Sequence, residues 1–299
     1  MAILSGAVGG LVLRNPVMLA AGILGTTGSS LRRAARAGAG CVVTKSVGAT
    51  PREGHPGPVV VQVEGGLLNA MGLPNPSYKN FQEEIDLARQ GGVPVVASIF
   101  GDGPEEFAEV ASGQDADCFE LNLSCPHAER YGSEIGCEPS NVEAITRAVK
   151  KSVDVPVWVK LTPNVADIVS LGKAAQRGGA DAVVAINTLK AMAIDVETGR
   201  PILSNRFGGL SGPAIKPVAI RCVFDLSAAL EVPVIGVGGI SSWEDAAEMI
   251  LAGAQGVQVG TALAGGYGIF GEITTGLERY LVRKGLTLME LRGAAGRTP

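Results

Sequence analysis

Eight short runs of apolar residues recur along the chain, and each run ends in small or polar residues. The runs are rich in Val and Ile and contain no regular polar alternation, which is typical of strands that are buried on both faces in a parallel sheet. We therefore predict eight parallel strands. They cover residues 16–22, 41–47, 94–100, 118–124, 156–162, 182–188, 233–239 and 256–262.

Segments with helical spacing separate these runs. Residues 140–153 and 241–253 are two examples, and each opens on a serine, Ser140 or Ser241, with an acidic residue in the first turn. Regular alternation of eight strands with helices predicts an α/β fold, a (β/α)8 TIM barrel, in which residues 1–299 form a single domain. A doubly wound sheet is the less favoured alternative, because it seldom needs eight regular repeats.

Two of the connections are much longer than the others, at about residues 48–93 and 189–232. Long connections in a compact domain usually carry structure of their own or a functional loop. We expect them to form extra hairpins or loops over the C-terminal mouth of the barrel.

A barrel of this kind places its functional groups at the C-terminal ends of the strands. Polar or glycine residues at or near the ends of the second to the eighth runs form one set of candidates. They are Lys45, Ser46, Ser98, Asn122, Cys125, Lys160, Asn187, Thr188, Gly238, Gly239, Gly260 and Thr261.

Glycines close the seventh and eighth strands, as Gly238-Gly239 and as Gly260 before Thr261. Each site alone would suit a tight turn. Together, at these two strands, they favour a phosphate site built from backbone N–H groups and the start of a short helix. A ligand with a phosphate tail is the expected occupant.

Lys45 and Lys160 interrupt otherwise apolar strands. A buried ammonium group needs an anionic or carbonyl partner, which could be a structural ion pair for either lysine taken alone. Two lysines at one barrel mouth suit a ligand with ring carbonyls or delocalised negative charge, such as a reduced flavin.

Three asparagines, Asn69, Asn122 and Asn187, could converge on a planar ligand, because an amide offers both a donor and an acceptor to a pyrimidine edge. Asparagine in loops also serves turns, and this alternative applies most to Asn69.

Cys125 follows the fourth strand and precedes Pro126. We expect this position to aim its side chain toward the mouth. A partly exposed thiol near positive charge can act as a general base. The other cysteines fit other roles: Cys41, Cys118 and Cys222 suit the core, and Cys137 is predicted to be non-catalytic.

Composition narrows the function further. A net charge of −4 without a Lys/Arg-rich run argues against nucleic acid as a partner. The apolar N-terminus lacks a basic start and is interrupted by Gly and Pro, so we expect neither a signal peptide nor a membrane span, and a cytoplasmic protein. Five cysteines without a CxxC pair, and two histidines, predict no disulfide framework, iron-sulfur cluster or structural metal in this chain.

Motifs along nearly the whole chain resemble one known family. The stretches TKSVGATPREGHPGP, LLNAMGLPNP, ELNLSCPH, VKLTPNV, INTLKAM, FGGLSGPAIKP, GVGGI and VGTAL, in this order, are similar to the catalytic subunit of class one dihydroorotate dehydrogenases. The resemblance implies that FMN lies across the mouth, that dihydroorotate is oxidised to orotate in pyrimidine biosynthesis, and that Cys125 takes the proton from C5.

The same resemblance assigns residues to each ligand. The positions implied for FMN are Ala21, Lys45, Ser46, Ser98, Asn122, Lys160, Ile186, Gly212, Gly238, Gly239, Gly260 and Thr261. Those implied for the substrate are Lys45, Asn69, Ala70, Met71, Gly72, Leu73, Asn122, Asn187 and Thr188.

The membrane-attached class carries Ser as its base and has an N-terminal membrane segment. With Cys125 at the position of the base and no such segment expected, this chain resembles class one instead. Residues 186–217 resemble the subtype that pairs with an iron-sulfur and FAD subunit and passes electrons to NAD. This implies a heterotetramer built around a homodimer, with FAD and a 2Fe-2S cluster only in the partner.

Two positions depart from the family pattern. His127 and Ser98 stand where many relatives have Asn. His127 could replace the expected contact with substrate or turn away from it, and the SCPH stretch also resembles that of dihydropyrimidine dehydrogenase.

The alternative functions are therefore a uracil or thymine reductase and a fumarate-linked dihydroorotate oxidase. An RNA-modifying flavoprotein would need a basic face, and a barrel without catalysis would leave Lys45, Lys160 and Cys125 without a role.

Overall fold

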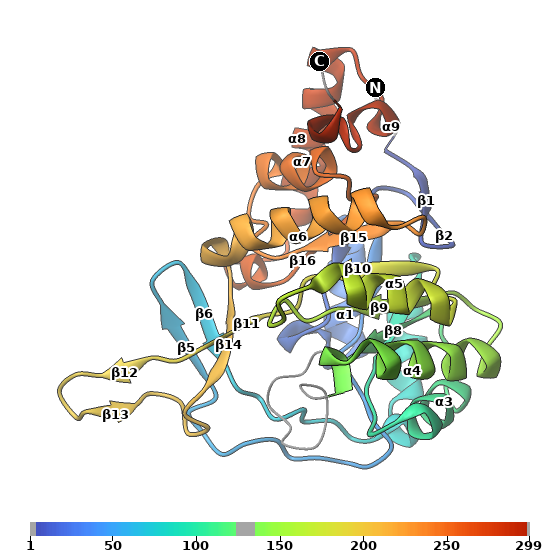
Figure 1. Ribbon diagram of the computed structural model, residues 1–299. Coiled ribbons are helices and arrows are strands. Elements are labelled where there is room, and N and C mark those ends of the chain that lie inside the picture. Colours follow the sequence, from blue (N-terminus) through green and yellow to red (C-terminus); the bar gives the residue numbers. More distant parts are fainter. Residues whose placement is uncertain (1–3, 124–134, 298–299) are drawn as a thin grey trace.

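A closed barrel of eight parallel strands forms the centre of the molecule (Figure 1). The structure, a computed structural model, describes residues 4–123 and 135–297. Each barrel strand pairs with the next one along the chain, and the last pairs with the first. The strands are β3 (Val17–Leu19), β4 (Cys41–Val43), β7 (Val95–Ile99), β8 (Cys118–Asn122), β9 (Val157–Lys160), β10 (Ala182–Ala185), β15 (Val234–Val237) and β16 (Gly256–Val259). All eight lie within the predicted runs, so the barrel is confirmed and the doubly wound alternative is wrong.

One helix follows each barrel strand and packs on the outside of the barrel (Figure 1). Outward-facing residues such as Val42 and Val257 pack against the helices, while inward-facing residues such as Met18 and Val96 fill the barrel. The apolar runs are continuous because both faces of every strand are covered. The helices are α1 (Gly28–Arg36), α2 (Gln82–Arg89), α3 (Pro104–Ser112), α4 (Pro139–Ser152), α5 (Ile168–Gly178), α6 (Lys216–Ala229), α7 (Trp243–Leu251) and α8 (Ile269–Lys284).

The starts of the two helices expected from sequence differ from the prediction in detail. At α7 the N-cap is Ser242 rather than Ser241, and its side chain accepts a hydrogen bond from the N–H of Asp245. The helix α4 starts at Pro139, with Glu138 and not Ser140 at the cap. Proline suits the first helical position because its missing N–H would have no intrahelical partner there.

A short hairpin closes the N-terminal end of the barrel. Its strands are β1 (Gly6–Val8) and β2 (Leu11–Leu13), whose apolar side chains join the inner core. The indole N–H of the fully buried Trp158 donates to the carbonyl of Gly9 over 2.7 Å. The described residues of this hairpin therefore cover the N-terminal end of the barrel.

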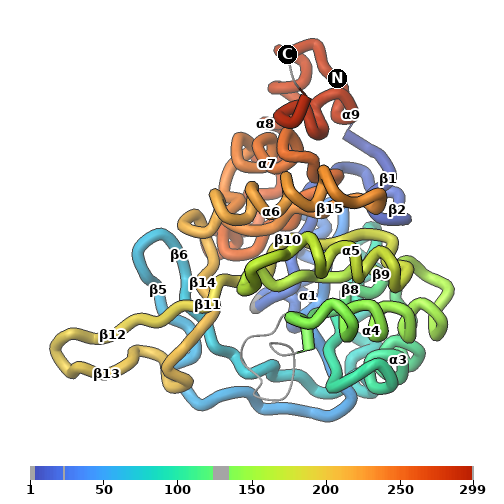
Figure 2. The backbone as a smooth tube through the Cα atoms, viewed as in Figure 1, coloured from blue at the N-terminus to red at the C-terminus, as the bar shows by residue number. Residues whose placement is uncertain are grey.

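Both long connections contribute to one sheet beside the C-terminal mouth, as the extra hairpins predicted from sequence. In this antiparallel sheet, β6 from the first connection pairs with β14 from the second. A separate hairpin extends from the sheet away from the barrel (Figure 2). The strands are β5 (Val60–Val63), β6 (Gly66–Asn69), β11 (Leu189–Ala191) and β14 (Gly208–Ser211) in the sheet, and β12 (Ile194–Asp195) and β13 (Arg200–Pro201) in the hairpin.

Short helical turns complete the described chain. They are η1 (Ile23–Gly25), η2 (Tyr78–Asn80), η3 (Ile135–Cys137), η4 (Pro213–Ile215), η5 (Thr261–Gly265), α9 (Leu288–Leu291) and η6 (Ala294–Gly296). The turn η5 directly follows the eighth barrel strand, the position at which TIM barrels commonly bind phosphate.

Candidate functional site

A cavity of about 680 Å³ occupies the C-terminal mouth of the barrel. It is bounded by strand ends, by the sheet that β6 and β14 share, and by η5. Nearly all the residues predicted for a cofactor or a substrate line it, although they come from distant parts of the chain. Those that line it are Ala21, Lys45, Ser46, Asn69, Met71, Gly72, Leu73, Asn122, Lys160, Ile186, Asn187, Thr188, Gly212, Gly238, Gly239, Gly260 and Thr261.

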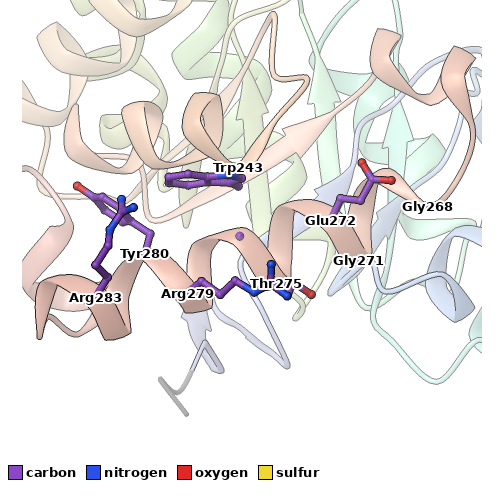
Figure 3. Close-up of a pocket in the computed structure, with 9 residues that line it drawn as sticks. Trp243, Gly268, Gly271, Glu272, Thr275, Arg279, Tyr280 and Arg283 are labelled. Atoms are coloured by element: carbon purple, nitrogen blue, oxygen red, sulfur yellow. The ribbon is translucent and has the colours of Figure 1, made fainter.

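A second hollow, of about 710 Å³, lies on the outer surface between α7 and α8. Figure 3 shows Trp243 facing the helix that carries Thr275 and Arg279. The rings of Trp243 and Tyr280 lie 5.4 Å apart, and Arg283 lies over the Tyr280 ring. None of the predicted site residues with a described position lines this groove. The two hollows are similar in volume, and the barrel mouth is the candidate site because the polar strand ends converge only there.

Glycines and a short helical turn line one side of the mouth. Gly239 has φ +74°, and a Cβ there would lie 2.6 Å from the Cβ of Lys216. At Gly260 a Cβ would meet only Ala20, at 3.6 Å. The hydroxyl of Thr261 donates to or accepts from Ser211 over 2.8 Å. With the backbone bare at these strand ends, N–H groups can approach an anionic group closely, as a phosphate cradle requires.

An acidic residue supports this cradle from behind. Asp245, near the start of α7, accepts hydrogen bonds from the N–H and hydroxyl of Ser241, both at 2.9 Å. Its other oxygen lies 2.7 Å from the ammonium of Lys216. Burial alone would raise the pKa of Asp245, but the hydrogen bonds from Lys216 and Ser241 outweigh it and hold the pKa below its usual range.

Lys160 lies on the floor of the cavity, and only 5% of its surface is exposed. Its ammonium is 3.4 Å from a carboxylate oxygen of Glu120, which is fully buried. The other carboxylate oxygen accepts a 2.7 Å hydrogen bond from the amide of Gln258. The structural ion pair that was an alternative for Lys160 is therefore present, but Lys160 also lines the cavity, so the two interpretations are compatible.

Lys45 reaches the same cavity from the end of β4. Its backbone N–H donates to the carbonyl of Gly25 over 2.8 Å, which fixes the chain where it leaves the barrel. Two ammonium groups on one cavity make it suitable for a ligand that carries or acquires negative charge.

A chain of side-chain hydrogen bonds crosses the mouth. The amide of Asn187 donates to the side-chain oxygen of Asn122 over 3.3 Å, and the amide of Asn122 donates to the Ser46 hydroxyl over 3.0 Å. The hydroxyls of Ser46 and Ser98 lie 2.8 Å apart. These amides are thus held in one orientation, which is what recognition of a planar ring with donors and acceptors needs.

Of the predicted site residues that the structure describes, two do not line the cavity. Ser98 is fully buried and holds Ser46 from behind, and Ala70 is fully buried next to Asn69. Asn69 itself lines the cavity and donates from its amide to the carbonyl of Gly209 over 3.1 Å. Ser98 and Ala70 therefore lie one layer behind the surface that a ligand would touch.

The predicted base, Cys125, and the neighbouring His127 lie outside the described residues. Among the described cysteines, burial raises the pKa of the thiols of Cys41 and Cys118 well above the ordinary value, with Asp117 and Glu120 adding to the effect on Cys41. Burial also raises the pKa of Cys137 and Cys222. All four thiols are therefore protonated near neutral pH.

Several lining residues were missed from sequence, including Ser211, Ser241, Gln258 and Tyr267. Gln258 is a polar residue inside the apolar eighth run, the same signal that singled out Lys45 and Lys160. Ser211 and Tyr267 carry no such signal, because they lie in connections whose path the sequence does not reveal.

Within residues 4–123 and 135–297 no cluster of His, Cys, Asp and Glu could hold a metal ion. The helices of this part of the chain are all too short or too polar to cross a membrane. The described mouth therefore offers an anion cradle, two ammonium groups and oriented amides. This combination suits a phosphate-bearing cofactor beside a small planar substrate.

Comparison with known proteins gives a consistent result. A family model described as "Dihydroorotate dehydrogenase" matches residues 3–281. The chain is 60% identical over 290 residues to a protein of Methanocella arvoryzae, covering 97% of this chain and 96% of the relative. It is 63% identical over 281 residues to one of Methanosarcina mazei, covering 92% and 90%. For one of Pyrococcus abyssi the identity is 53% over 290 residues, covering 96% and 97%. All three are named "Dihydroorotate dehydrogenase B (NAD(+)), catalytic subunit".

Proposed function

This chain belongs to the dihydroorotate dehydrogenase family, and on that premise we propose that it oxidises (S)-dihydroorotate to orotate in pyrimidine biosynthesis and passes the electrons on to NAD through a partner subunit. The observation that supports this most is the convergence of Lys45, Lys160, Asn122 and Asn187 on one cavity with a glycine-lined anion cradle. Neither uracil reduction nor a link to fumarate is favoured by the names of the relatives.

The proposed cofactor is FMN, held by residues 1–299 acting as a single domain. The mouth has one cradle for a phosphate, at the ends of β15 and β16, and this matches the single phosphate of FMN. Bound flavin supplies the hydride acceptor for C6 of the substrate. The proposed FMN ligands that line the cavity are Ala21, Lys45, Ser46, Asn122, Lys160, Ile186, Gly212, Gly238, Gly239, Gly260 and Thr261, with Ser98 supporting Ser46.

The substrate would occupy the side of the mouth nearest β6. Its carbonyl and N–H groups match the amides of Asn122 and Asn187, while Lys45 supplies positive charge for its carboxylate. The loop after β6 closes this side. The proposed substrate residues that line it are Lys45, Asn69, Met71, Gly72, Leu73, Asn122, Asn187 and Thr188, and Ala70 packs behind them.

Cys125 is proposed as the general base whose Sγ takes the proton from C5. In the sequence it is the third residue after Asn122, the last residue of β8, and catalytic residues of a TIM barrel commonly follow the C-terminal ends of its strands. Of the five cysteines it is the one that follows a strand end directly, and the thiols described in the structure are protonated and mostly buried.

The partner would be an electron-transfer subunit that carries FAD and a 2Fe-2S cluster, in a cytoplasmic heterotetramer built on a homodimer of this chain. The words "catalytic subunit" and "NAD(+)" in the names of the relatives support a partner and this electron acceptor. The cysteine spacing of this chain, without a CxxC pair, suits clusters held elsewhere.

Anaerobic titration of the purified protein with dihydroorotate tests the activity. The yellow colour should bleach, and flavin extracted from the protein should have the mass of FMN. A flavin that stays oxidised under dihydroorotate would overturn the proposal, and faster reoxidation by uracil than by orotate would favour the pyrimidine reductase. Cys125→Ser should slow the bleaching strongly with flavin still bound, whereas the matched variant Cys222→Ser should not.

A further inference from the structure

Glu120 is a buried acidic residue that the proposed chemistry does not use. It points into the barrel from β8, two residues before Asn122, and none of its surface is exposed. Lys160 and Gln258, which contact its carboxylate, both line the cavity, whereas Glu120 does not. Seen from the cavity, the carboxylate therefore lies behind the lysine.

The contacts of Glu120 are few for a buried charge. Among the residues that the structure describes, Lys160 is the only basic side chain within 4.0 Å of it, and Gln258 is its only hydrogen-bond donor. In the same part of the chain, the Glu120 oxygen nearest Lys160 makes no hydrogen bond of good geometry. A buried carboxylate is costly unless it is paired, so its presence here needs an explanation other than packing.

The carboxylate changes the charge that the cavity presents. An ammonium group at the floor would attract a ligand that gains negative charge, and a carboxylate 3.4 Å from that ammonium offsets much of this attraction at low dielectric. A flavin gains negative charge on reduction. The strength of the Glu120–Lys160 pair should therefore affect the reduced state of a bound flavin more than its oxidised state.

We propose that Glu120 is a positioning residue that fixes Lys160 beneath the flavin and, by offsetting its charge, keeps the reduction potential of the flavin low. This inference rests on the proposed function, because it requires a flavin above Lys160. A low potential favours the onward transfer of electrons to NAD, whereas an uncompensated lysine would retain them on the flavin.

The test is the midpoint potential of the flavin bound to the full-length Glu120→Gln protein, measured anaerobically against reference dyes. We expect a shift to more positive potential. A tenfold gain in affinity for reduced over oxidised flavin would correspond to about 30 mV for a two-electron couple. Glu105→Gln, which removes an exposed carboxylate on α3, is the matched control and should leave the potential unchanged.

A purely structural role gives a different result. Loss of Glu120 would then lower the melting temperature and weaken the binding of oxidised and reduced flavin equally, with no change in potential, and this outcome would overturn the inference. If Glu120→Gln does not fold, Glu120→Asp is the second test, because its shorter side chain keeps the negative charge but holds it farther from the ammonium of Lys160. It should shift the potential in the same direction by less, and an unchanged potential would again overturn the inference.

The two proposals can fail separately. If dihydroorotate does not bleach the wild-type flavin, the proposed function is wrong. If it bleaches the flavin normally but the potential does not respond to Glu120, only the role of Glu120 is wrong.

Discussion

The side-chain amide of Asn187 donates a hydrogen bond to the side-chain oxygen of Asn122 over 3.3 Å. Asn122 is the last residue of β8, and Asn187 lies two residues after the end of β10. These two strands are not neighbours, because β9 lies between them in the barrel. The side-chain oxygen of Asn187 in turn accepts from the N–H of Thr188 over 2.8 Å, which orients its amide. Asn187 thus fixes which edge of Asn122 faces the cavity.

Replacement of Asn187 by Ala should raise the KM for dihydroorotate while the flavin content stays normal. Loss of this hydrogen bond and of the substrate contact should cost about 1 to 2 kcal/mol, or roughly five- to thirtyfold in KM. Steady-state kinetics with the purified enzyme measures this. Asn80→Ala, at an exposed residue of η2 that does not line the cavity, is the control, and an equal KM in both variants would contradict the assignment.

Two glycines of the cradle should respond differently to a methyl group. Gly260→Ala should fold normally, because its Cβ meets only Ala20 at 3.6 Å, but it should weaken flavin binding, since the methyl group intrudes on the cavity. We expect a loss of about tenfold or more, which corresponds to roughly 1.4 kcal/mol. Fluorescence titration of the apoprotein with FMN would show it.

Gly239→Ala serves as the comparison. Its positive φ and the 2.6 Å approach to Lys216 should lower the melting temperature as well as the affinity. If Gly260→Ala also lowers the melting temperature strongly, the cradle is a structural turn rather than a phosphate site.

The stabilising effect of Asp245 should depend on pH. Its pKa is lower in the folded protein than the usual 3.9 or so of an unfolded chain, so its contribution is present above about pH 4 and is lost as the pH falls through the folded pKa. Asp245→Asn should cost about 1 to 3 kcal/mol at pH 7. The difference from wild type should narrow toward pH 3.

Thermal unfolding of both proteins between pH 3 and pH 7 tests this. Asp154→Asn removes an exposed carboxylate from the loop after α4 and should show no such trend. A constant difference between Asp245→Asn and wild type across this range would contradict the linkage.

The core thiols should resist alkylation. Burial keeps Cys41 and Cys118 protonated well above neutral pH, and the thiolate is the reactive form. Native protein treated with iodoacetamide at pH 8 should therefore carry no label at these two positions when its peptides are analysed by mass spectrometry. Unfolded protein should be labelled at both, and rapid labelling of Cys41 in the native state would show that the barrel opens.

The barrel could be predicted from sequence because each apolar run is short, separate and covered on both faces. Parallel strands of a barrel end at the same mouth, so the residues at the strand ends could be placed together without knowledge of any contact. The prediction that Lys45, Asn122 and Lys160 share one cavity is confirmed. Long-range pairing could not be predicted in the same way. Nothing in the two long connections indicates that Asn69 and Gly209 are neighbours.

The buried layer beneath the mouth could also not be predicted in full. Ser98 was placed with the cofactor residues, but it lies inside β7 and faces Ser46 rather than the cavity. Glu120 and Gln258 interrupt apolar runs as the lysines do, so the signal was present. What the sequence could not reveal is that the acid and the lysine lie within 3.4 Å of each other.

The sheet shared by β6 and β14 also has a consequence for how the protein is made. Because β6 ends at Asn69 and its partner β14 ends at Ser211, the substrate side of the mouth can form only after the chain has been synthesised through Ser211. Until then the nascent chain carries β6 with one edge unpaired, which is a site for association with other chains. A truncated product that stops before β14 would contain six of the barrel strands and yet lack this wall of the substrate site.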